Sequence, residues 1–331
     1  RQRRERKHRH MTIESWYWRA VESIDYPFPQ RIHPDADWLE QEIIEWCCAH
    51  RLIQSQEQIK HIRDALLAEF VSRANADLNR PMLRLIGLWT VWFFFLDDLT
   101  DTVPSVDALA DFHLRILSAT AEDTTYGQVH PLISAVADLW AELRRYAGLV
   151  TQVRFQRALV QTLEAHLWEV STRVDRVYPD SATYADMRLW SGAFFPMIAL
   201  IDMARDFVLP SYLFEHALMR ELLDAAARTV LWYNDLWSYP KEQSANALAH
   251  NIVHILIQEQ RLSLYEALDR VITQHNWSLR RFLELKQRIQ GFSGENAQTT
   301  IFLENVAAWL RATQDWSHRT NRYRSQDIIK I

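Results

Sequence analysis

The sequence predicts an all-α protein that folds as a single helical domain. Its 331 residues are 48% hydrophobic and 12% aromatic, which is ample material for one large core. Only 6 Gly and 10 Pro occur, and the stretches between them are rich in Ala, Leu, Glu, Arg and Gln, which favour helices. Strand-like alternation is nearly absent, and no fixed-period repeat, composition shift or Ser/Gly-rich linker divides the chain. We therefore expect one bundle of ten or more helices.

The amino-terminal residues are the least helix-like part of the chain. The first ten, RQRRERKHRH, carry a net charge of +5, whereas the remainder carries −10 and the whole chain −5. We expect a solvated, disordered tail there, with a basic arm for nucleic acid as the alternative. The first Met is Met11, so we expect the tail to come from an upstream start or from a sequence added for expression. Pro27, Pro29 and Pro34 mark an extended lead-in, and we assign residues 1–26 to the tail and lead-in.

Helical spacing begins in DADWLEQEIIEWCCAHRLI, where Leu39, Ile43, Trp46 and Cys47 share one face. The further segments with helical periodicity cover about 61–74, 81–99, 106–120, 130–147, 151–173, 181–206, 211–237, 244–258, 262–289 and 299–316. The breakers between them include Pro104, Tyr178-Pro179-Asp180, Pro210-Ser211 and the stretch from Gly291 to Gly294.

The longest nearly unbroken apolar run, Leu85 to Leu96, predicts a buried core helix. It is too short to span a membrane, which takes about 20 residues, so we expect no transmembrane segment. Cys47 and Cys48 are adjacent, so they cannot readily form a structural disulfide and lack the spacing of metal ligands. We therefore expect a reducing, cytoplasmic setting. No G-x-G-x-x-G or G-x-x-x-x-G-K-[ST] motif occurs, so a phosphate would have to be bound by other means.

An acidic cluster follows this run directly, in FFFLDDLTD at residues 93–101. On a helix, Asp97 and Asp101 lie on the same face, with Asp98 about 100° round from Asp97. No basic residue lies nearby in the sequence, and buried carboxylates need a cation or become protonated. Mg²⁺ is typically held by one or two carboxylates, waters and the phosphates of a substrate. The alternative is a helix that ends at Leu96 and leaves these acids in solvent.

A second oxygen-rich motif, NDLWSYPKE, begins at Asn234. Asn234, Ser238 and Glu242 are spaced i, i+4 and i+8 along one helix face, and together offer an amide oxygen, a hydroxyl and a carboxylate to a hard metal ion. Lys241 beside them is a candidate contact for a diphosphate. The alternative is an ordinary helix end whose polar residues cap the backbone. Two such motifs in one helical chain favour the metal interpretation.

The two motifs resemble the paired metal motifs of microbial class I terpene synthases, an aspartate-rich DDxxD, here DDLTD, and an ND-L-x-S-x-x-x-E motif, here NDLWSYPKE. Arg188 lies 46 residues before Asn234, where the family places its diphosphate-sensing arginine. Gly192 stands four residues later, at the position of the family's helix-break effector.

The resemblance extends to the carboxyl-terminal part of the chain. Arg322-Tyr323 in WSHRTNRYR is similar to the family's terminal Arg-Tyr pair, and Trp309 resembles a cavity-lining tryptophan. The resemblance covers about Pro27 to Tyr323. One residue departs from the family pattern: Ser191 stands where the family often has an acidic residue between sensor and effector, so we expect the two to be coupled differently here.

The resemblance implies a single class I terpenoid synthase bundle with a central active-site cavity, formed by residues 27–323 and followed by a tail at 324–331. It implies an enzyme, a carbon-oxygen lyase that ionises a linear isoprenoid diphosphate and cyclises the carbocation. Farnesyl diphosphate is the expected substrate because it is common in the family, and three Mg²⁺ ions are the expected cofactors. The implied metal ligands are Asp97, Asp98, Asp101, Asn234, Ser238 and Glu242. The implied diphosphate contacts are Arg188, Lys241, Arg322 and Tyr323.

The aromatic residues before the aspartates have a second expected role. Phe93 and Phe94 lie three and four positions before Asp97, so they can face the cavity one turn below the metals, where their rings would stabilise a carbocation. Ordinary core packing is the alternative for each ring, and we expect it for Phe95 and Trp92.

Other functions stay open at the level of sequence. The substrate could be geranyl or geranylgeranyl diphosphate, and a chain-elongating prenyltransferase shares the fold but typically carries two aspartate-rich motifs. A non-enzymatic helical scaffold with a nucleic-acid-binding tail is the alternative from another class. His250 and His254 have zinc-ligand spacing without a third ligand, so we expect structural roles for them. We expect no nucleic-acid partner, and the sequence leaves a homodimer open.

Overall fold

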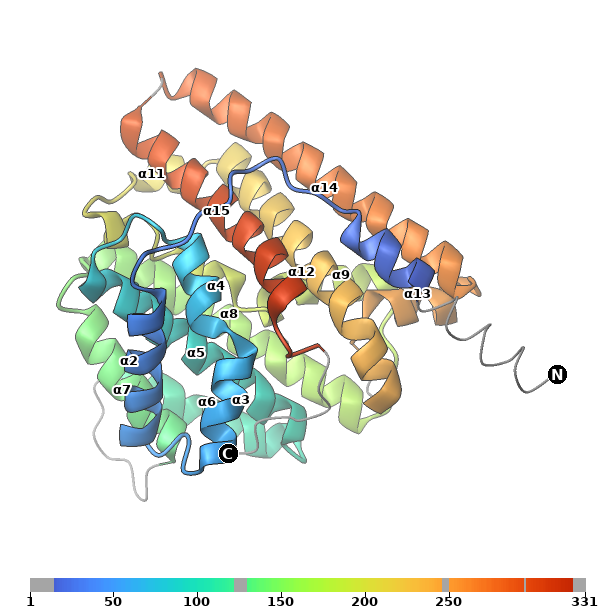
Figure 1. Cartoon of the computed structure of the whole chain (residues 1–331), viewed down its shortest axis with the longest axis horizontal. Helices are drawn as coiled ribbons and strands as arrows, with labels where there is room; N and C mark the ends of the chain where they lie inside the picture. The colour runs from blue at the N-terminus through green and yellow to red at the C-terminus, as the bar shows by residue number, and fades with distance from the viewer. Residues whose placement is uncertain (1–14, 122–129, 246–249, 295, 324–331) are drawn as a thin grey trace.

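The structure, a computed structural model, describes residues 15–121, 130–245, 250–294 and 296–323 (Figure 1). Within these residues the chain is mainly helical and contains no strand, which confirms the predicted all-α class. A helical stretch at 15–22 is followed by α2 (Ala36–Ala49), α3 (Gln56–Ala65), α4 (Leu67–Ala74), α5 (Arg80–Thr102), α6 (Val106–Thr120), α7 (Pro131–Leu143), α8 (Leu149–Val174), α9 (Ser181–Ser191), α10 (Phe194–Ile198), a 3₁₀ turn (Met203–Arg205), α11 (Ser211–Phe214), α12 (Ala217–Ala245), α13 (Ile252–Gln260), α14 (Leu264–Phe292) and α15 (Ala297–Arg319).

Local sequence signals explain where the long helices begin. The side chain of Asn79 accepts a hydrogen bond from the Met82 N–H at 3.0 Å and so caps α5, with Pro81 in the first turn. Ser263 and Glu266 form a reciprocal capping box at the start of α14. These caps satisfy backbone donors that the first turn of a helix leaves unpaired, which fixes the starting points of both helices.

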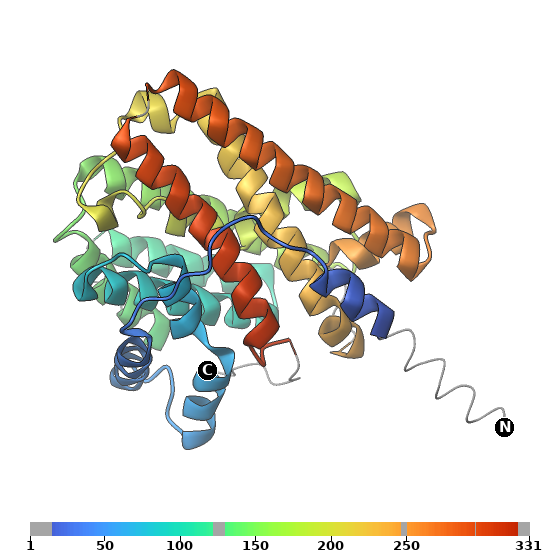
Figure 2. The same cartoon turned by 45° about the horizontal axis from the view of Figure 1, so that its top comes forward.

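The predicted core helix, α5, is buried on every side. Leu85, Leu88, Trp89, Val91 and Trp92 have no exposed surface, and α2, α4 and α7 pack around this part of the helix. The long helix α12 packs along α14 and also contacts α15, as both views of the fold show (Figures 1 and 2). The acidic end of α5 contacts Arg322, just beyond the end of α15.

The lead-in segment belongs to the packed structure, which corrects the expected domain boundary at residue 27. Tyr17, Val21 and Tyr26 are buried, and the Tyr17 hydroxyl donates to the Leu236 carbonyl of α12 at 2.5 Å. The side-chain amide of Gln314 accepts from the Tyr26 N–H at 3.2 Å, which ties the segment to α15. Proline spacing alone could not reveal these contacts because their partners lie more than 200 residues away. Residues 1–10 and 324–331, expected as tails, lie outside the described residues.

Three predicted segments are each divided in the structure, and the one at 211–237 is shared between α11 and α12, which continues to Ala245. The segment at 61–74 is part of α3 and α4, which meet at Leu66 in a left-handed conformation with φ 53°. The segment at 181–206 is divided after α9, where Gly192 and Ala193 interrupt the helix and Ala193 has φ 53°. A stretch with continuous helical periodicity can still be broken, because periodicity does not report the backbone conformation of a single residue.

The stretch at 181–205 is also the one described segment whose length and composition would allow it to cross a membrane. In the structure it is shared among α9, α10 and the 3₁₀ turn, and most of it is buried inside the bundle. A buried core segment passes the same test, so the finding is weak support for a membrane span. Cys47 is buried, Cys48 is exposed and both are free, as their adjacency predicts.

Candidate active site

A cavity of about 920 Å³ lies in the bundle, enclosed mainly by α5, α8, the break after α9, α12 and α15. All the site residues that the sequence predicts line it, although they come from five separate regions of the chain. They are Phe93, Phe94, Asp97, Asp98, Asp101, Arg188, Gly192, Asn234, Ser238, Lys241, Glu242, Trp309, Arg322 and Tyr323. The cavity therefore brings together every residue that the two motifs and the resemblance singled out.

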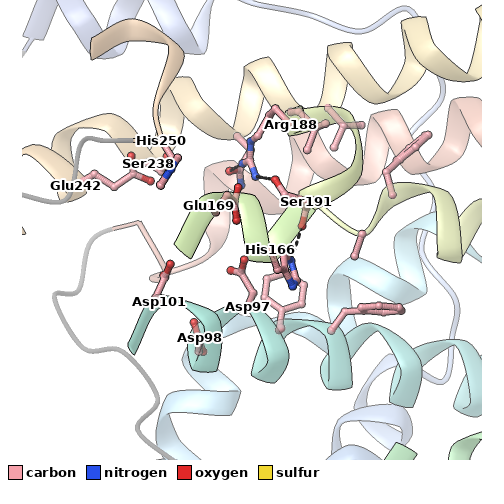
Figure 3. A pocket seen from close by; sticks show the side chains of 18 of the residues that line it. Asp97, Asp98, Asp101, His166, Glu169, Arg188, Ser191, Ser238, Glu242 and His250 are labelled. Atoms are coloured by element: carbon pink, nitrogen blue, oxygen red, sulfur yellow. Dashed lines mark hydrogen bonds between the residues drawn. The ribbon is translucent and has the colours of Figure 1, made fainter. Parts of the chain in front are cut away.

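The aspartates form one wall of the cavity, at the carboxyl-terminal end of α5 (Figure 3). The helix continues to Thr102, so the alternative in which it ends at Leu96 is wrong. The guanidinium of Arg322 lies 2.9 Å from Asp98 Oδ1 and 3.4 Å from Asp97 Oδ2. The compensating charge that the local sequence lacks is thus supplied from the carboxyl-terminal part of the chain.

An arginine that sequence reasoning missed holds the end of this wall. Arg173 of α8 donates to the Thr100 carbonyl at 2.9 Å and to the Val103 carbonyl at 2.8 Å. These are carbonyls at the carboxyl-terminal end of α5, which have no partner within the helix. Because Arg173 lies only one residue before the end of α8, its basic character looked like an ordinary helix terminus in the sequence.

The second wall is the face of α12 that carries Asn234, Ser238 and Glu242. Asn234 Oδ1 accepts from Arg188 at 2.9 Å, and Asn234 Nδ2 donates to the Tyr323 hydroxyl at 2.7 Å. Asn251 donates to Glu242 Oε2 at 2.9 Å and faces Ser238 Oγ at 3.4 Å. All three predicted ligand side chains are therefore already oriented by neighbouring polar groups.

Asn251 and Asp235 are functional neighbours that sequence reasoning missed. Asn251 is the N-cap of α13, and an Asn before an apolar helical segment is a recognisable signal for that role. Asp235 lies inside the second motif and is 1% exposed. It accepts from Arg188 Nε at 3.1 Å, from the Tyr184 hydroxyl at 2.7 Å and from the backbone N–H of residue 252 at 3.1 Å. Asp235 thereby fixes the guanidinium of Arg188 against Asn234.

Five carboxylates and five Lys or Arg side chains line the cavity, and three of the carboxyl groups have raised pKa values. Burial raises the pKa of Asp97. Burial, followed by the charges of Asp97 and Glu169, raises the pKa of Asp101 well above its usual value. Burial also raises the pKa of Glu242 to about 7. Figure 3 shows Glu169 of α8 between Arg188 and the aspartates, so a further carboxylate adds to the same region.

The donor set fits a hard divalent cation. Asp98 Oδ2 is buried and has no hydrogen-bond partner among the described residues, so one carboxylate oxygen is free for an ion. Carboxylate, amide and hydroxyl oxygens are the ligands that Mg²⁺ prefers. Within the described part of the chain, no three His, Cys, Asp or Glu side chains are grouped closely enough to hold an ion on their own. Oxygens from a phosphate-bearing substrate would have to complete the coordination.

Below the two polar walls the cavity is lined by apolar and aromatic side chains. Phe93 and Phe94 face it from α5, and Trp309 and Trp316 face it from α15. The ring of Phe94 also lies under the Arg322 guanidinium, at 4.8 Å. Phe95 and Trp92 do not line the cavity, which agrees with the core role expected for them. The cavity thus has a charged end and an apolar end, joined at Phe94.

The two histidines with zinc-ligand spacing do not form a zinc site with a third ligand in the described residues. His250 lies 2.7 Å from the Thr172 hydroxyl, and the ring of His254 packs beside Tyr178. Burial lowers the pKa of both imidazoles. They therefore have the local partners of structural histidines at the edge of the cavity.

A sequence model of the family described as "Terpene synthase family 2, C-terminal metal binding" matches residues 88–281, which is more than half of the chain. The chain belongs to this terpene synthase family. The matched residues include the part of α5 that carries the aspartates, Arg188 and the second motif on α12.

Characterised relatives extend the likeness over nearly the whole terpene synthase. This chain is 29% identical to (+)-T-muurolol synthase ((2E,6E)-farnesyl diphosphate cyclizing) of Roseiflexus castenholzii, over 92% of this chain and 95% of that protein. It is 25% identical to 4-epi-cubebol synthase ((2E,6E)-farnesyl diphosphate cyclizing) of Streptosporangium roseum, over 90% of each chain. It is 24% identical to germacrene A synthase of Nostoc punctiforme, over 92% of this chain and 95% of that protein.

Solved structures show the same fold. A structure of a-eudesmol synthase matches with a TM-score of 0.80 and 21% identity, over 89% of this chain and 98% of that one. Hedycaryol synthase matches with a TM-score of 0.79 and 20% identity, over 89% and 97%. This terpene synthase is therefore of the bacterial class I type, a terpene cyclase and a carbon-oxygen lyase.

Proposed function

We propose that this terpene synthase is a Mg²⁺-dependent sesquiterpene cyclase that ionises farnesyl diphosphate, cyclises the carbocation to a hydrocarbon or alcohol, and releases diphosphate. One observation carries the proposal: a single cavity has facing oxygen-rich walls at one end and aromatic side chains at the other. Breaking an allylic carbon-oxygen bond leaves the electron pair on the diphosphate and a positive charge on the carbon chain. The two ends of the cavity match the two products of that step.

The proposed metal ligands are Asp97, Asp98 and Asp101 on α5 and Asn234, Ser238 and Glu242 on α12. Three Mg²⁺ ions, when bound, would neutralise the diphosphate and make it a better leaving group. The two walls come from different helices, so a diphosphate between them can share oxygens with both. Each ligand side chain that already has a protein partner would exchange it when the site is loaded.

Four further residues are proposed to bind the leaving group. Arg188 and Arg322 are charge-assisted donors on opposite sides of the cavity, and the Tyr323 hydroxyl lies beside Asn234. Lys241 lines the same end, and burial, followed by the charge of Arg322, lowers its pKa. An anion between these groups could accept hydrogen bonds from all four.

The carbocation is proposed to stay at the apolar end. The faces of Phe93, Phe94 and Trp309 line that end, and an aromatic face stabilises positive charge. Gly192 is proposed to act at the break after α9, where the last carbonyls of the helix have no partner within it. Closing the charged end over the substrate would exclude water that could quench the cation. The reaction ends when a carbon atom loses a proton or a water molecule adds.

The chain length of the substrate is proposed from the relatives, two of which are named as cyclising farnesyl diphosphate. Geranyl and geranylgeranyl diphosphate are the alternatives. The free cysteines support a reducing, cytoplasmic setting as part of the same proposal.

The test is to incubate the purified protein separately with geranyl, farnesyl and geranylgeranyl diphosphate, with Mg²⁺ and with a chelator, and to analyse the extracts by gas chromatography with mass detection. We expect a cyclic C15 product from farnesyl diphosphate that disappears with the chelator. A cyclic product from another substrate would correct the chain length. No product from any of the three, with the protein folded, would overturn the proposal.

A further inference from the structure

His166 of α8 links the aspartate helix to the break after α9. Its side chain is 1% exposed and reaches the wall of the cavity. Nε2 lies 3.0 Å from the Ser191 carbonyl oxygen, and Nδ1 lies 3.4 Å from the Thr100 hydroxyl. Figure 3 shows the imidazole between α5 and the end of α9, with its bond to Ser191. No feature of the family resemblance singled out this histidine.

The partners of the imidazole fix its tautomer. A carbonyl oxygen only accepts hydrogen bonds, so Nε2 of His166 carries the proton and donates it to Ser191. In the neutral ring Nδ1 is then an acceptor, and the single proton of the Thr100 hydroxyl is shared between the Leu96 carbonyl at 2.8 Å and Nδ1 at 3.4 Å, so the contact with Nδ1 is the weaker one. His166 therefore links Thr100 of α5 to the backbone at the break, with a weak contact at Thr100 and a full hydrogen bond at Ser191.

Both ends of this link lie at functional positions. Thr100 stands between Asp98 and Asp101 on α5, and Ser191 is the last residue of α9, directly before Gly192. A movement of the aspartates on binding a ligand would therefore move a neighbour of His166. At the other end, His166 donates its hydrogen bond to the carbonyl of the peptide that joins Ser191 to Gly192.

Ser191 lies between Arg188, the sensor position, and Gly192, the effector position, and two of its atoms have polar contacts. Its hydroxyl lies 3.3 Å from Arg188 Nη1, and its carbonyl accepts from His166. An acidic side chain at this position could pair with Arg188 by charge, whereas a hydroxyl forms a weaker bond. The bond from His166 to the backbone supplies a second connection that does not depend on the side chain at position 191.

We propose that His166 is a positioning residue that couples the occupied aspartate wall to the Ser191–Gly192 peptide. The inference rests on the proposed function. His166 holds the carbonyl of Ser191 in one orientation, so the break presents a fixed backbone to the substrate when the carbon-oxygen bond breaks. Loss of the N–H donor leaves diphosphate binding in place but lets the peptide turn, which slows ionisation.

The experiment compares His166→Leu with His166→Gln, whose side-chain amide supplies an N–H near the position of Nε2. His113→Leu is the matched control. His113 is 3% exposed and its ring lies 6.3 Å from that of His166, but neither of its nitrogens has a hydrogen-bond partner among the described residues. Steady-state kinetics with farnesyl diphosphate and Mg²⁺ are measured together with calorimetric binding of inorganic diphosphate and Mg²⁺.

In His166→Leu we expect kcat to fall about 100-fold, the size of effect that a small misplacement of reacting groups produces. KM and the Kd for inorganic diphosphate should stay within about 3-fold of wild type, because the interaction lost is one realised in the transition state. We expect His166→Gln to recover about 10-fold of the loss and His113→Leu to keep a wild-type kcat. Equal losses in the His166→Leu and His113→Leu variants would show a packing role and overturn the proposal. So would a wild-type kcat in His166→Leu, or a loss of diphosphate affinity as large as the loss of kcat.

Hydrogen exchange tests the role of His166 without depending on turnover. Peptides that cover residues 189–195 should exchange faster in His166→Leu than in wild type and His113→Leu, whatever substrate the enzyme uses. Wild-type protein that turns over no isoprenoid diphosphate would overturn the proposed function alone. Unchanged exchange at 189–195 in His166→Leu would overturn the coupling even if the enzyme is active.

Discussion

Arg322 lies 2.9 Å from Asp98, although the two residues are 224 positions apart in the chain. The same guanidinium lies 3.4 Å from Asp97 and over the ring of Phe94 at 4.8 Å. One arginine thus contacts two proposed metal ligands and one ring at the boundary with the apolar end. Because Arg322 pairs with these aspartates, its proposed role with a diphosphate requires it to exchange carboxylate partners for phosphate oxygens.

Replacing this arginine should impair turnover strongly. We expect Arg322→Gln to lower kcat/KM about 100-fold or more, because a charge-assisted contact to the leaving group is lost. The matched control is Arg319→Gln near the same helix end, where the arginine pairs with Glu69 at 2.6 Å and is half-exposed. The control should stay within about 2-fold of wild type, since surface pairs contribute little. Equal kcat/KM values in the two variants would contradict the role of Arg322.

Removing a proposed metal ligand should abolish turnover without unfolding the protein. We expect Asp97→Ala and Asn234→Ala to give no detectable product, while circular dichroism shows unchanged helical content. Asp111→Ala is the control, because Asp111 is an exposed acid on α6 that pairs with Arg115. Its activity should equal that of wild type. Full activity in either ligand variant would remove that residue from the metal site.

The sequence predicted those features that depend on neighbours along one helix. The spacing within DDLTD and NDLWSYPKE, and the apolar character of α5 before its aspartates, could be read directly. Each motif lies on a single helix, so its geometry follows from 3.6 residues per turn. The meeting of both motifs in one cavity was expected only from the family resemblance, because no local pattern reports which helices pack together.

Contacts between distant segments could not be predicted. The pairing of Arg322 with Asp98, and that of Asp235 with Arg188, join residues that are far apart in the sequence. For the same reason the sequence did not predict that Tyr17 packs against α12, before the expected domain start at residue 27. A charged residue at a helix end or inside a motif looks the same whether its partner is water or a distant side chain, so sequence alone does not distinguish these cases.

The cavity aromatics should control the product rather than the fold. We expect Phe93→Leu and Phe94→Leu to change the mixture of terpene products, because each removes an aromatic face from the cavity wall. Phe95→Leu is the matched control: Phe95 is next in the chain, is 1% exposed and does not line the cavity. It should lower the melting temperature but keep the product profile, as measured by gas chromatography. An unchanged profile and rate in the Phe93 and Phe94 variants would return those rings to ordinary core packing.

Stability without metal should depend on pH through the crowded carboxylates. Burial raises the pKa of Glu242 to about 7. A carboxyl group with a raised folded-state pKa favours the folded state while it is protonated, and this contribution is lost as pH rises through the folded-state value. We therefore expect the melting temperature of metal-free protein to fall by a few degrees between pH 5 and pH 8, with Glu242→Gln reducing the fall.

Mg²⁺ with inorganic diphosphate should reverse this loss, and more strongly at pH 8 than at pH 6. Metal ligands must be deprotonated, so protons compete with the metal at the lower pH. Differential scanning fluorimetry with and without Mg²⁺ and diphosphate measures the effect. Equal stabilisation by Mg²⁺ and diphosphate at both pH values would show that Glu242 does not titrate at the site.

The close approach of α12 should favour glycine at position 192, in the break after α9. A Cβ built there would lie 2.2 Å from Cδ2 of Leu231 on α12, so Leu231 would have to rotate or the break would have to move. Leu231 lines the cavity, and its rotation would alter the contour that folds the substrate. We expect Gly192→Ala to cost about 1–3 kcal/mol of stability, the usual range for overpacking, and to change the product mixture.

A double-mutant cycle with Leu231→Ala tests whether this clash is the cause. Leu231→Ala alone should destabilise the protein by about 2–5 kcal/mol, since it opens a cavity. The double variant should be more stable than the sum of the two single effects predicts, because the methyl group added at position 192 fills part of the space that the leucine side chain leaves.

Gly291→Ala is the matched control, as a Cβ at that exposed helical position meets nothing within 4 Å. It should leave activity unchanged and raise stability slightly, because alanine favours helix. Additive effects of Gly192→Ala and Leu231→Ala would show that contact with Leu231 is not what makes position 192 sensitive.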